Sequence, residues 1–157
     1  MSSGIIGEVT TDTEAVDNDL IERLRARGQR VTSQRLVINR MLRSRDQHVT
    51  AEEVLGAVTK TLPGTSLPTV YATLELFEQL GIVRRVNSGG GAVLFDSRTV
   101  DHHHLICRSC GAVQDLDHEI PLDGVLDAAR AQGFSPGRAA IVVDGLCSRC
   151  GGETSAD

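Results

Sequence analysis

The sequence predicts an α+β protein built from two small domains, and three observations support this prediction. Four helical stretches are followed by two short strands, an order typical of a winged helix-turn-helix. The second half follows the order strand, strand, helix, strand, which predicts a small α/β module. Two Cys-x-x-Cys pairs lie at opposite ends of that module, so a bound metal can stabilise a domain too small for a large core.

Composition and charge limit the class of protein. The chain has 157 residues, of which 40% are hydrophobic but only 3% aromatic, so its cores depend on Leu, Val and Ile. The sequence has neither a membrane-spanning apolar run nor a signal-peptide pattern, which predicts a cytoplasmic protein with reduced thiols and no membrane partner. Residues 20–87 carry a net charge of +5 although the whole chain carries −5, which is compatible with nucleic-acid binding or with an ordinary solvated surface.

The N-terminal half predicts four helices behind a mobile tail. Residues 1–16 are polar and aperiodic, so we expect them to form the tail. The expected helix caps are Asn18 or Asp19, Ser33, Thr50 in a capping box with Glu53, and Ser66. Residues 67–80 predict the fourth helix, the recognition helix of the winged helix-turn-helix, with a core stripe of Val70, Leu74, Phe77 and Leu80. Thr69 and Tyr71 lie off that stripe.

Residues 82–157 contain strand patterns that complete the first domain and define a second one. Residues 82–87 and 92–96 predict two strands joined by an SGGG turn, which complete the winged domain. The expected organisation is a winged-helix domain over residues 17–96, a hinge over 97–101, a second domain over 102–151 and a tail over 152–157. The second domain contains expected strands at 102–107, 111–117 and 138–147 and a helix at 121–133.

The four cysteines predict a structural zinc site. Cys107, Cys110, Cys147 and Cys150 form two Cys-x-x-Cys pairs, each expected at a turn where both thiolates can face one ion. Four thiolates in tetrahedral geometry are typical of a closed Zn²⁺ site, one per chain. Four unrelated buried cysteines, or a redox pair, fit the pattern less well, because no βαβ unit surrounds either motif.

The run of histidines at 102–104 predicts a second metal site. Strand alternation places His102 and His104 on one face and His103 on the other. Asp96 precedes this run and Asp115 lies on the next strand, so the residues offer a mixed nitrogen and oxygen shell suited to Fe²⁺, Mn²⁺, Co²⁺, Ni²⁺ or Zn²⁺. Taken alone, the histidine run could also be a solvated loop that binds no metal. Taken alone, His48 is interpreted as a surface histidine at the start of a helix.

Several motifs together resemble the ferric uptake regulator family over residues 17–151. They are GQRVTSQR, QHVTAEEVL, TVYATLELFEQLGIV, HHHLICRSCG and LCSRC. The resemblance implies a homodimer formed through the C-terminal domain, a winged-helix reader of double-stranded operator DNA, a structural zinc and a regulatory metal at the hinge. It assigns the regulatory metal to His48, Asp96, His102, His104 and Asp115.

The resemblance also implies how DNA is read and which signal is sensed. Its DNA contacts fall on Arg30, Arg35, Thr69 and Tyr71, while Ala72 stands where many members carry Arg or Asn. Aspartate at both 96 and 115 resembles the peroxide-sensing branch, in which the regulatory metal is Fe²⁺ or Mn²⁺ and a histidine ligand is oxidised. His48 and His102 are the histidines exposed to that oxidation, and Zn²⁺ can occupy the same site in a crystal.

The leading hypothesis is therefore a metal-dependent repressor that responds to peroxide, iron or manganese. Alternatives are a sensor of iron supply, zinc, manganese or nickel, a metal-dependent hydrolase, and a purely structural zinc module. Against a hydrolase, no nucleophile or general-base motif accompanies the histidines, and the chain leaves little room for a pocket for a small organic substrate.

Overall fold

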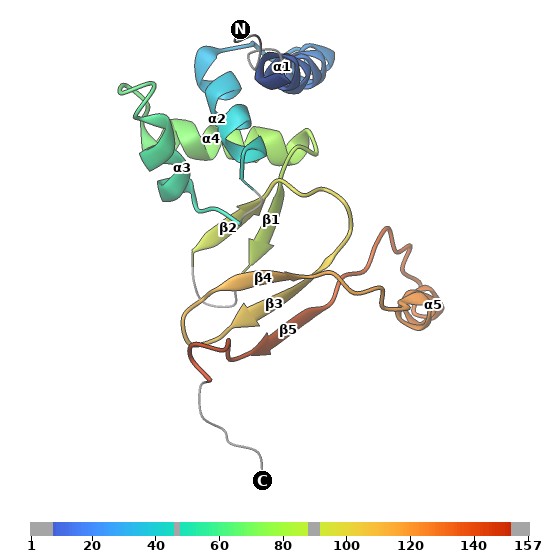
Figure 1. Cartoon of the computed structure of the whole chain (residues 1–157). Helices are drawn as coiled ribbons and strands as arrows, with labels where there is room; N and C mark the ends of the chain where they lie inside the picture. The colour runs from blue at the N-terminus through green and yellow to red at the C-terminus, as the bar shows by residue number, and fades with distance from the viewer. Residues whose placement is uncertain (1–7, 46–47, 88–91, 152–157) are drawn as a thin grey trace, which may run out of the picture. The chain divides into compact units, whose positions relative to one another are not determined.

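The computed structural model divides into two compact units, coloured along the chain in Figure 1. The N-terminal unit contains Met1–Val86 and Val93–Thr99, and the C-terminal unit contains Asn87–Ala92 and Val100–Asp157. No described helix is both long and apolar enough to cross a membrane. The residues that the structure describes are 8–45, 48–87 and 92–151.

The first helix, α1, is longer than the sequence predicts. It spans Glu8–Ala26, so the predicted start at residue 18 or 19 and the predicted tail over residues 8–16 are wrong. Residues 1–7 lie outside the described part. The reason is tertiary, because the second helix holds this segment: the Asn39 side-chain amide donates to the Val16 carbonyl, and Arg40 pairs with Asp17.

Helices α2 (Ser33–Arg43) and α3 (Ala51–Val58) start at side-chain caps. The cap of α2 is Thr32, whose hydroxyl accepts from the Arg35 backbone N–H at 3.3 Å, so the predicted cap at Ser33 is wrong by one residue. The predicted capping box of α3 is confirmed: Thr50 and Glu53 each accept the other's backbone N–H, at 3.1 and 2.8 Å. These caps satisfy N–H groups that the first helical turn leaves without partners.

Helix α4 (Leu67–Gln79) crosses the core of the N-terminal unit. Val70, Leu74 and Phe77 are fully buried, which confirms these three positions of the predicted stripe. Leu80 is only partly buried and packs at the margin of the cluster. The core also contains buried side chains from the other helices and from the strands, including Leu20, Leu24, Ile38, Leu42, Val54, Val58 and Phe95.

Strands β1 (Arg84–Asn87) and β2 (Val93–Asp96) form a two-stranded sheet, all of which except Asn87 belongs to the N-terminal unit. The predicted SGGG turn lies outside the described residues. Val49 and Phe95 join β2 to the segment before α3 through two backbone hydrogen bonds of 3.0 and 2.8 Å. Because these two residues are neighbours of His48 and Asp96, the bridge fixes the backbone beside both predicted ligands.

The described part of the C-terminal unit contains a three-stranded sheet and one helix. Its strands are ordered β4–β3–β5, and β3 pairs antiparallel with β4 and parallel with β5. This confirms the predicted order of strand, strand, helix and strand, with shorter elements than expected. The bounds are β3 His103–Cys107, β4 Val113–Leu116, α5 Asp123–Ala131 and β5 Val142–Gly145.

The two units differ in how much apolar surface they bury. Within the described part of the C-terminal unit, Ile106 and Cys107 are the buried apolar residues, whereas Val125, Phe134 and Leu146 are exposed. A unit with so small a core of its own needs a further source of stability, such as a metal or a partner subunit.

Candidate metal centres and DNA-reading surface

The four cysteines converge at one end of the C-terminal sheet. Cys107 ends β3, Cys110 follows in the turn to β4, and Cys147 and Cys150 follow β5. Because β3 and β5 are parallel neighbours, their carboxyl ends meet and bring the two pairs together. The four sulfur atoms lie within 4.8 Å of one another, and none of the cysteines forms a disulfide. This donor set fits a tetrahedral zinc ion.

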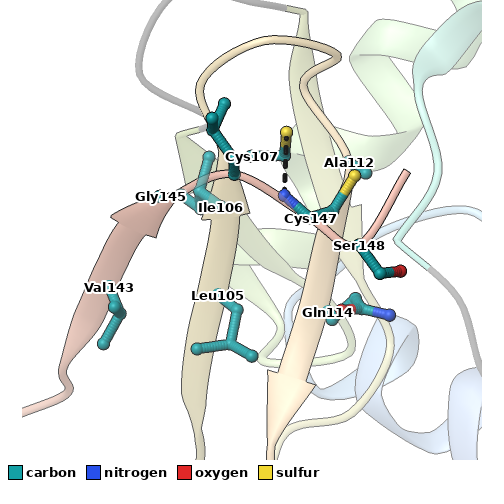
Figure 2. Close-up of a pocket in the computed structure, with 10 residues that line it drawn as sticks. Leu105, Ile106, Cys107, Ala112, Gln114, Val143, Gly145, Cys147 and Ser148 are labelled. Carbon is teal, nitrogen blue, oxygen red and sulfur yellow. Dashed lines mark hydrogen bonds between the residues drawn. The ribbon is translucent and has the colours of Figure 1, made fainter. Parts of the chain in front are cut away.

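Backbone N–H groups prepare the Cys107 thiol for metal binding. The N–H groups of Cys110 and Cys147 lower the pKa of Cys107 to about 6, and Figure 2 shows the bond from Cys147 N to the Cys107 Sγ at 3.4 Å. For Cys150, the hydrogen bond of the Ser109 side chain lowers the pKa, but the neighbouring thiols and burial together outweigh it and raise the pKa to about 11. Four crowded thiols cannot all ionise without a cation to offset their charge.

The second donor set of this unit is formed by His102, His104 and Asp115. The two rings face one side of the sheet with their centroids 4.5 Å apart, and their Nε2 atoms lie 3.3 and 3.9 Å from Asp115 Oδ1. The register explains the approach, since His104 lies directly opposite Asp115. His102 Nδ1 lies 2.8 Å from the carbonyl of Val100, which can only accept, so Nε2 of the neutral ring carries the lone pair.

His103 is oriented differently, as strand alternation predicts. Its Nδ1 accepts the backbone N–H of Ile141 at 3.1 Å, and the side chain is buried on the other side of β3. That bond uses the Nδ1 lone pair and makes His103 a structural link between β3 and the segment before β5. It therefore takes no part in the donor set of His102, His104 and Asp115.

The N-terminal unit holds the remaining two predicted ligands. The Val49–Phe95 bridge places His48 beside Asp96, with His48 Nε2 at 3.7 Å from Asp96 Oδ2. The other carboxylate oxygen, Oδ1, accepts the Arg98 backbone N–H at 2.7 Å, which orients the group. One imidazole and one carboxylate are thus prepared in this unit for an ion that accepts nitrogen and oxygen ligands.

The predicted DNA contacts occupy the start of α2 and the first turns of α4. The Arg35 guanidinium donates to the Arg30 carbonyl, and these two residues lie on either side of the Thr32 cap in the chain. The Thr69 hydroxyl lies 2.9 Å from the Ser66 hydroxyl. Tyr71 is 37% exposed and lies off the buried stripe of α4, and its phenol donates to Glu52 Oε1 at 3.3 Å.

Sequence reasoning missed three residues that hold this surface together. Glu52 on α3 accepts from Tyr71, Arg85 on β1 pairs with Glu78 of α4 at 3.1 Å, and Arg23 on α1 donates to the Leu80 carbonyl after α4 at 3.2 Å. Each contact joins two different secondary-structure elements, so the pattern within either element does not indicate it.

Comparison with known proteins assigns the family. The profile of the Ferric uptake regulator family matches residues 26–143, about three quarters of the chain. The chain belongs to the ferric uptake regulator family. The resemblance predicted from the motifs is therefore confirmed, and with it a metal-dependent transcriptional regulator with a winged-helix domain and a C-terminal dimerisation domain fold.

Individual members of the ferric uptake regulator family match over most of the chain. The peroxide-responsive repressor PerR of Staphylococcus epidermidis is 34% identical over 90% of this chain and 97% of its own. The transcriptional regulator FurA of Mycobacterium tuberculosis is 34% identical over 84% and 90%. The ferric uptake regulator of Pseudomonas aeruginosa, solved with manganese, is 31% identical over 80% and 96%, with a TM-score of 0.66.

Proposed function

We propose that this protein is a homodimeric repressor whose affinity for double-stranded operator DNA is set by a regulatory Fe²⁺ or Mn²⁺ and by peroxide. A structural Zn²⁺ on the four cysteines stabilises the C-terminal domain. The regulatory metal takes His48 and Asp96 from the N-terminal unit and His102, His104 and Asp115 from the C-terminal unit. Residues 97–101 act as the hinge between a winged-helix domain and a dimerisation domain.

The division of the ligands between two units is the observation that carries this proposal. Each unit contributes an incomplete shell, with one imidazole and one carboxylate in the first and two imidazoles and one carboxylate in the second. Together they supply the mixed nitrogen and oxygen shell that Fe²⁺ and Mn²⁺ accept. The chain then binds the ion most tightly when its two units approach each other. The metal favours this closed arrangement because it binds the closed arrangement with higher affinity than the open one.

Exposed apolar side chains support the homodimer. Val142, Val143 and Leu146 are about half exposed on and just after β5, and Phe134 is 73% exposed. A cavity of about 290 Å³ opens on this sheet, with Leu105, Val143 and Cys147 among its lining residues (Figure 2). Several exposed apolar side chains on so small a unit are typical of an interface between subunits. In the dimer, two recognition helices can reach successive major-groove half-sites.

Arg30 and Arg35 are expected to bind DNA phosphates. Replacing either with Ala weakens binding to every duplex and lowers the slope of log affinity against log salt by about 1, because one fewer counterion is released. Fluorescence anisotropy over a salt series measures this slope, with Arg130→Ala on α5 as the matched control. A changed sequence preference without a change in slope contradicts the assignment.

Peroxide is the signal best supported by the ligands and the relatives. Aspartate occupies both carboxylate positions, 96 and 115, and a peroxide-responsive repressor shares 34% identity over nearly the whole chain. Bound Fe²⁺ would supply the electron that activates hydrogen peroxide. On the protein side, the imidazoles of His48 and His102 are the groups positioned to be oxidised, and their loss as ligands releases DNA.

One experiment tests this function. The zinc-replete protein is loaded with Fe²⁺ or Mn²⁺, its operator affinity is measured, and hydrogen peroxide is added before peptide mass analysis. We expect a gain of one oxygen on the peptides that contain His48 or His102, with loss of DNA binding, for the Fe²⁺ form and not for the Mn²⁺ form. DNA affinity that ignores every divalent metal would remove the regulatory site from the proposal.

A second candidate within the family is a sensor of metal supply. The relative from Pseudomonas aeruginosa was solved with manganese, and the donor set here also accepts zinc or nickel. Oxidation separates the two candidates, because a supply sensor keeps its histidines intact under the same peroxide treatment. A hydrolase is the weakest alternative, since family membership already accounts for the metal ligands and the DNA-reading helix.

A further inference from the structure

A cavity of about 440 Å³ lies between the start of α2 and the loop that joins α3 to α4. One wall is formed by Thr32, Ser33 and Gln34, and the other by residues 62–65. Both walls belong to the N-terminal unit, and α4 begins two residues after Thr65. The described residues that line the cavity include no acidic side chain, so no carboxylate in the wall repels an anion.

The first turn of α2 carries two backbone N–H groups beside this cavity. Thr32 is the N-cap, and its hydroxyl and carbonyl accept the N–H groups of Arg35 and Leu36. The N–H groups of Ser33 and Gln34 precede those bonds and have no acceptor within the helix. Such N–H groups attract anions, and the first turn of α2 contains no acidic residue that would serve instead.

Thr65 is a second and independent indication of a ligand. Its side chain lines the cavity and is only 7% exposed, yet its hydroxyl oxygen has no hydrogen-bond partner among the described residues. Buried hydroxyl groups in proteins usually have a partner, because an unpaired one loses its bonds to water without replacement. An acceptor bound in the cavity can supply this partner, and the hydroxyl breaks no existing hydrogen bond to reach it.

The donors define the chemistry of the ligand. Two N–H groups and one hydroxyl suit the several acceptor oxygens of a tetrahedral oxyanion such as phosphate. A phosphate of the DNA backbone is favoured over a free anion by the neighbouring residues. Arg30 and Arg35, the expected phosphate contacts, lie within three residues of Ser33, and the recognition helix begins two residues after Thr65.

We propose that this cavity is a phosphate-binding site, in which the N–H groups of Ser33 and Gln34 and the hydroxyl of Thr65 hold one backbone phosphate of the operator in each half-site. The inference rests on the proposed DNA-binding function and adds a site to it. Unlike the arginines, these donors carry no formal charge. The site therefore fixes the position of the DNA backbone without releasing further counterions.

Two substitutions each remove one donor from the site. Ser33 is the first residue of α2, a position that tolerates proline, and Thr32 before it already has the extended backbone that proline requires, with φ −130° and ψ 152°. Ser33→Pro therefore deletes one N–H group, and Ser33→Ala is the matched control that retains it. Thr65→Val exchanges the hydroxyl for a methyl group, and Thr61→Val, exposed in the same loop, is its control.

Fluorescence anisotropy measures operator binding by the zinc-replete, Mn²⁺-loaded, full-length proteins over a salt series. We expect Ser33→Pro and Thr65→Val each to weaken binding about 10-fold, as for the loss of one hydrogen bond to a charged acceptor, with an unchanged salt slope. This result distinguishes them from Arg30→Ala and Arg35→Ala, which lower the slope. Ser33→Ala and Thr61→Val should bind as the wild type does, and thermal unfolding verifies that every variant is folded.

Neutral substitutions in the DNA backbone identify the occupant. A methylphosphonate replaces one operator phosphate at a time, and at one position per half-site it should weaken binding by the wild type but have little further effect on Thr65→Val. If no position depends on Thr65, the cavity does not hold a DNA phosphate and the inference is wrong. The same conclusion follows if sulfate shifts the amide resonances of Ser33 and Gln34 in the Mn²⁺-free protein while both variants bind operator normally, because the site then takes only a free anion.

Failure of the proposed function gives a different result. A wild type that binds no duplex at any Mn²⁺ concentration overturns the DNA-binding function, and the phosphate site with it. A wild type that binds operator with a normal metal response, while Ser33→Pro and Thr65→Val bind equally well, overturns the phosphate site alone.

Discussion

Removing the metal from the four-cysteine cluster is expected to unfold the C-terminal unit. The described part of this unit buries few apolar side chains of its own, and its three strands meet the two cysteine pairs at one end of the sheet. Structural zinc contributes an apparent free energy on the order of 10–16 kcal/mol at neutral pH, more than a small core can replace. Without it, four adjacent thiols, one with a pKa of about 6, repel one another as they ionise.

Chelation followed by two measurements tests this expectation. After metal loss is verified by elemental analysis, hydrogen exchange should become fast in β3, β4 and β5 but stay slow in α4, whose core is separate and independent of the cysteines. Sedimentation should then report monomers. Cys110→Ser, at an exposed position, should reproduce the effect, and Ser148→Ala is the matched control. A dimer that persists after complete zinc removal would show that the cysteines do not support the interface.

Local sequence patterns predicted the elements whose causes are local. The stripe of Val70, Leu74 and Phe77 is buried as its spacing requires, and the Thr50–Glu53 box forms because both partners lie within one turn. The early start of α1 was missed, since its first turns lack a clear apolar stripe and the contacts from α2 reach the helix at Val16 and Asp17. Long-range contacts determine where α1 begins, and the periodicity of apolar residues in the sequence does not reveal such contacts.

In the candidate sites, too, the features with local causes were predicted and those with long-range causes were missed. Cysteine spacing predicted that the four thiols converge, and the structure confirms this, because two Cys-x-x-Cys pairs at turns can bring four sulfur atoms together. Strand alternation predicted that His103 turns away from His102 and His104, and the bond to the Ile141 N–H gives the reason. Glu52 was missed as the partner of Tyr71, because its only local feature is a place in the first turn of a helix, where glutamate is common.

His104→Ala is expected to abolish the effect of the regulatory metal on DNA affinity while leaving the fold intact. His104 is only partly buried and lies opposite Asp115 on β4, so truncation removes a donor without opening a core. Allosteric couplings are typically about 1–3 kcal/mol, so Mn²⁺ should tighten operator binding by the wild type about 5- to 150-fold. The variant should bind operator with the same weak affinity at every Mn²⁺ concentration.

The control variant His118→Ala tests whether the lost metal response is specific to His104. His118 is exposed in the loop after β4, so its loss removes an imidazole of the same type from the same unit. We expect this control to keep the full metal response, as measured by anisotropy titrations with equal zinc content in all proteins. If His104→Ala retains the response, the ion that controls DNA binding is held elsewhere. If both variants lose the metal response, the substitutions act by destabilising the C-terminal unit and not by removing a metal ligand. A ligand can shift the equilibrium only if it binds the metal more tightly in one state than in the other.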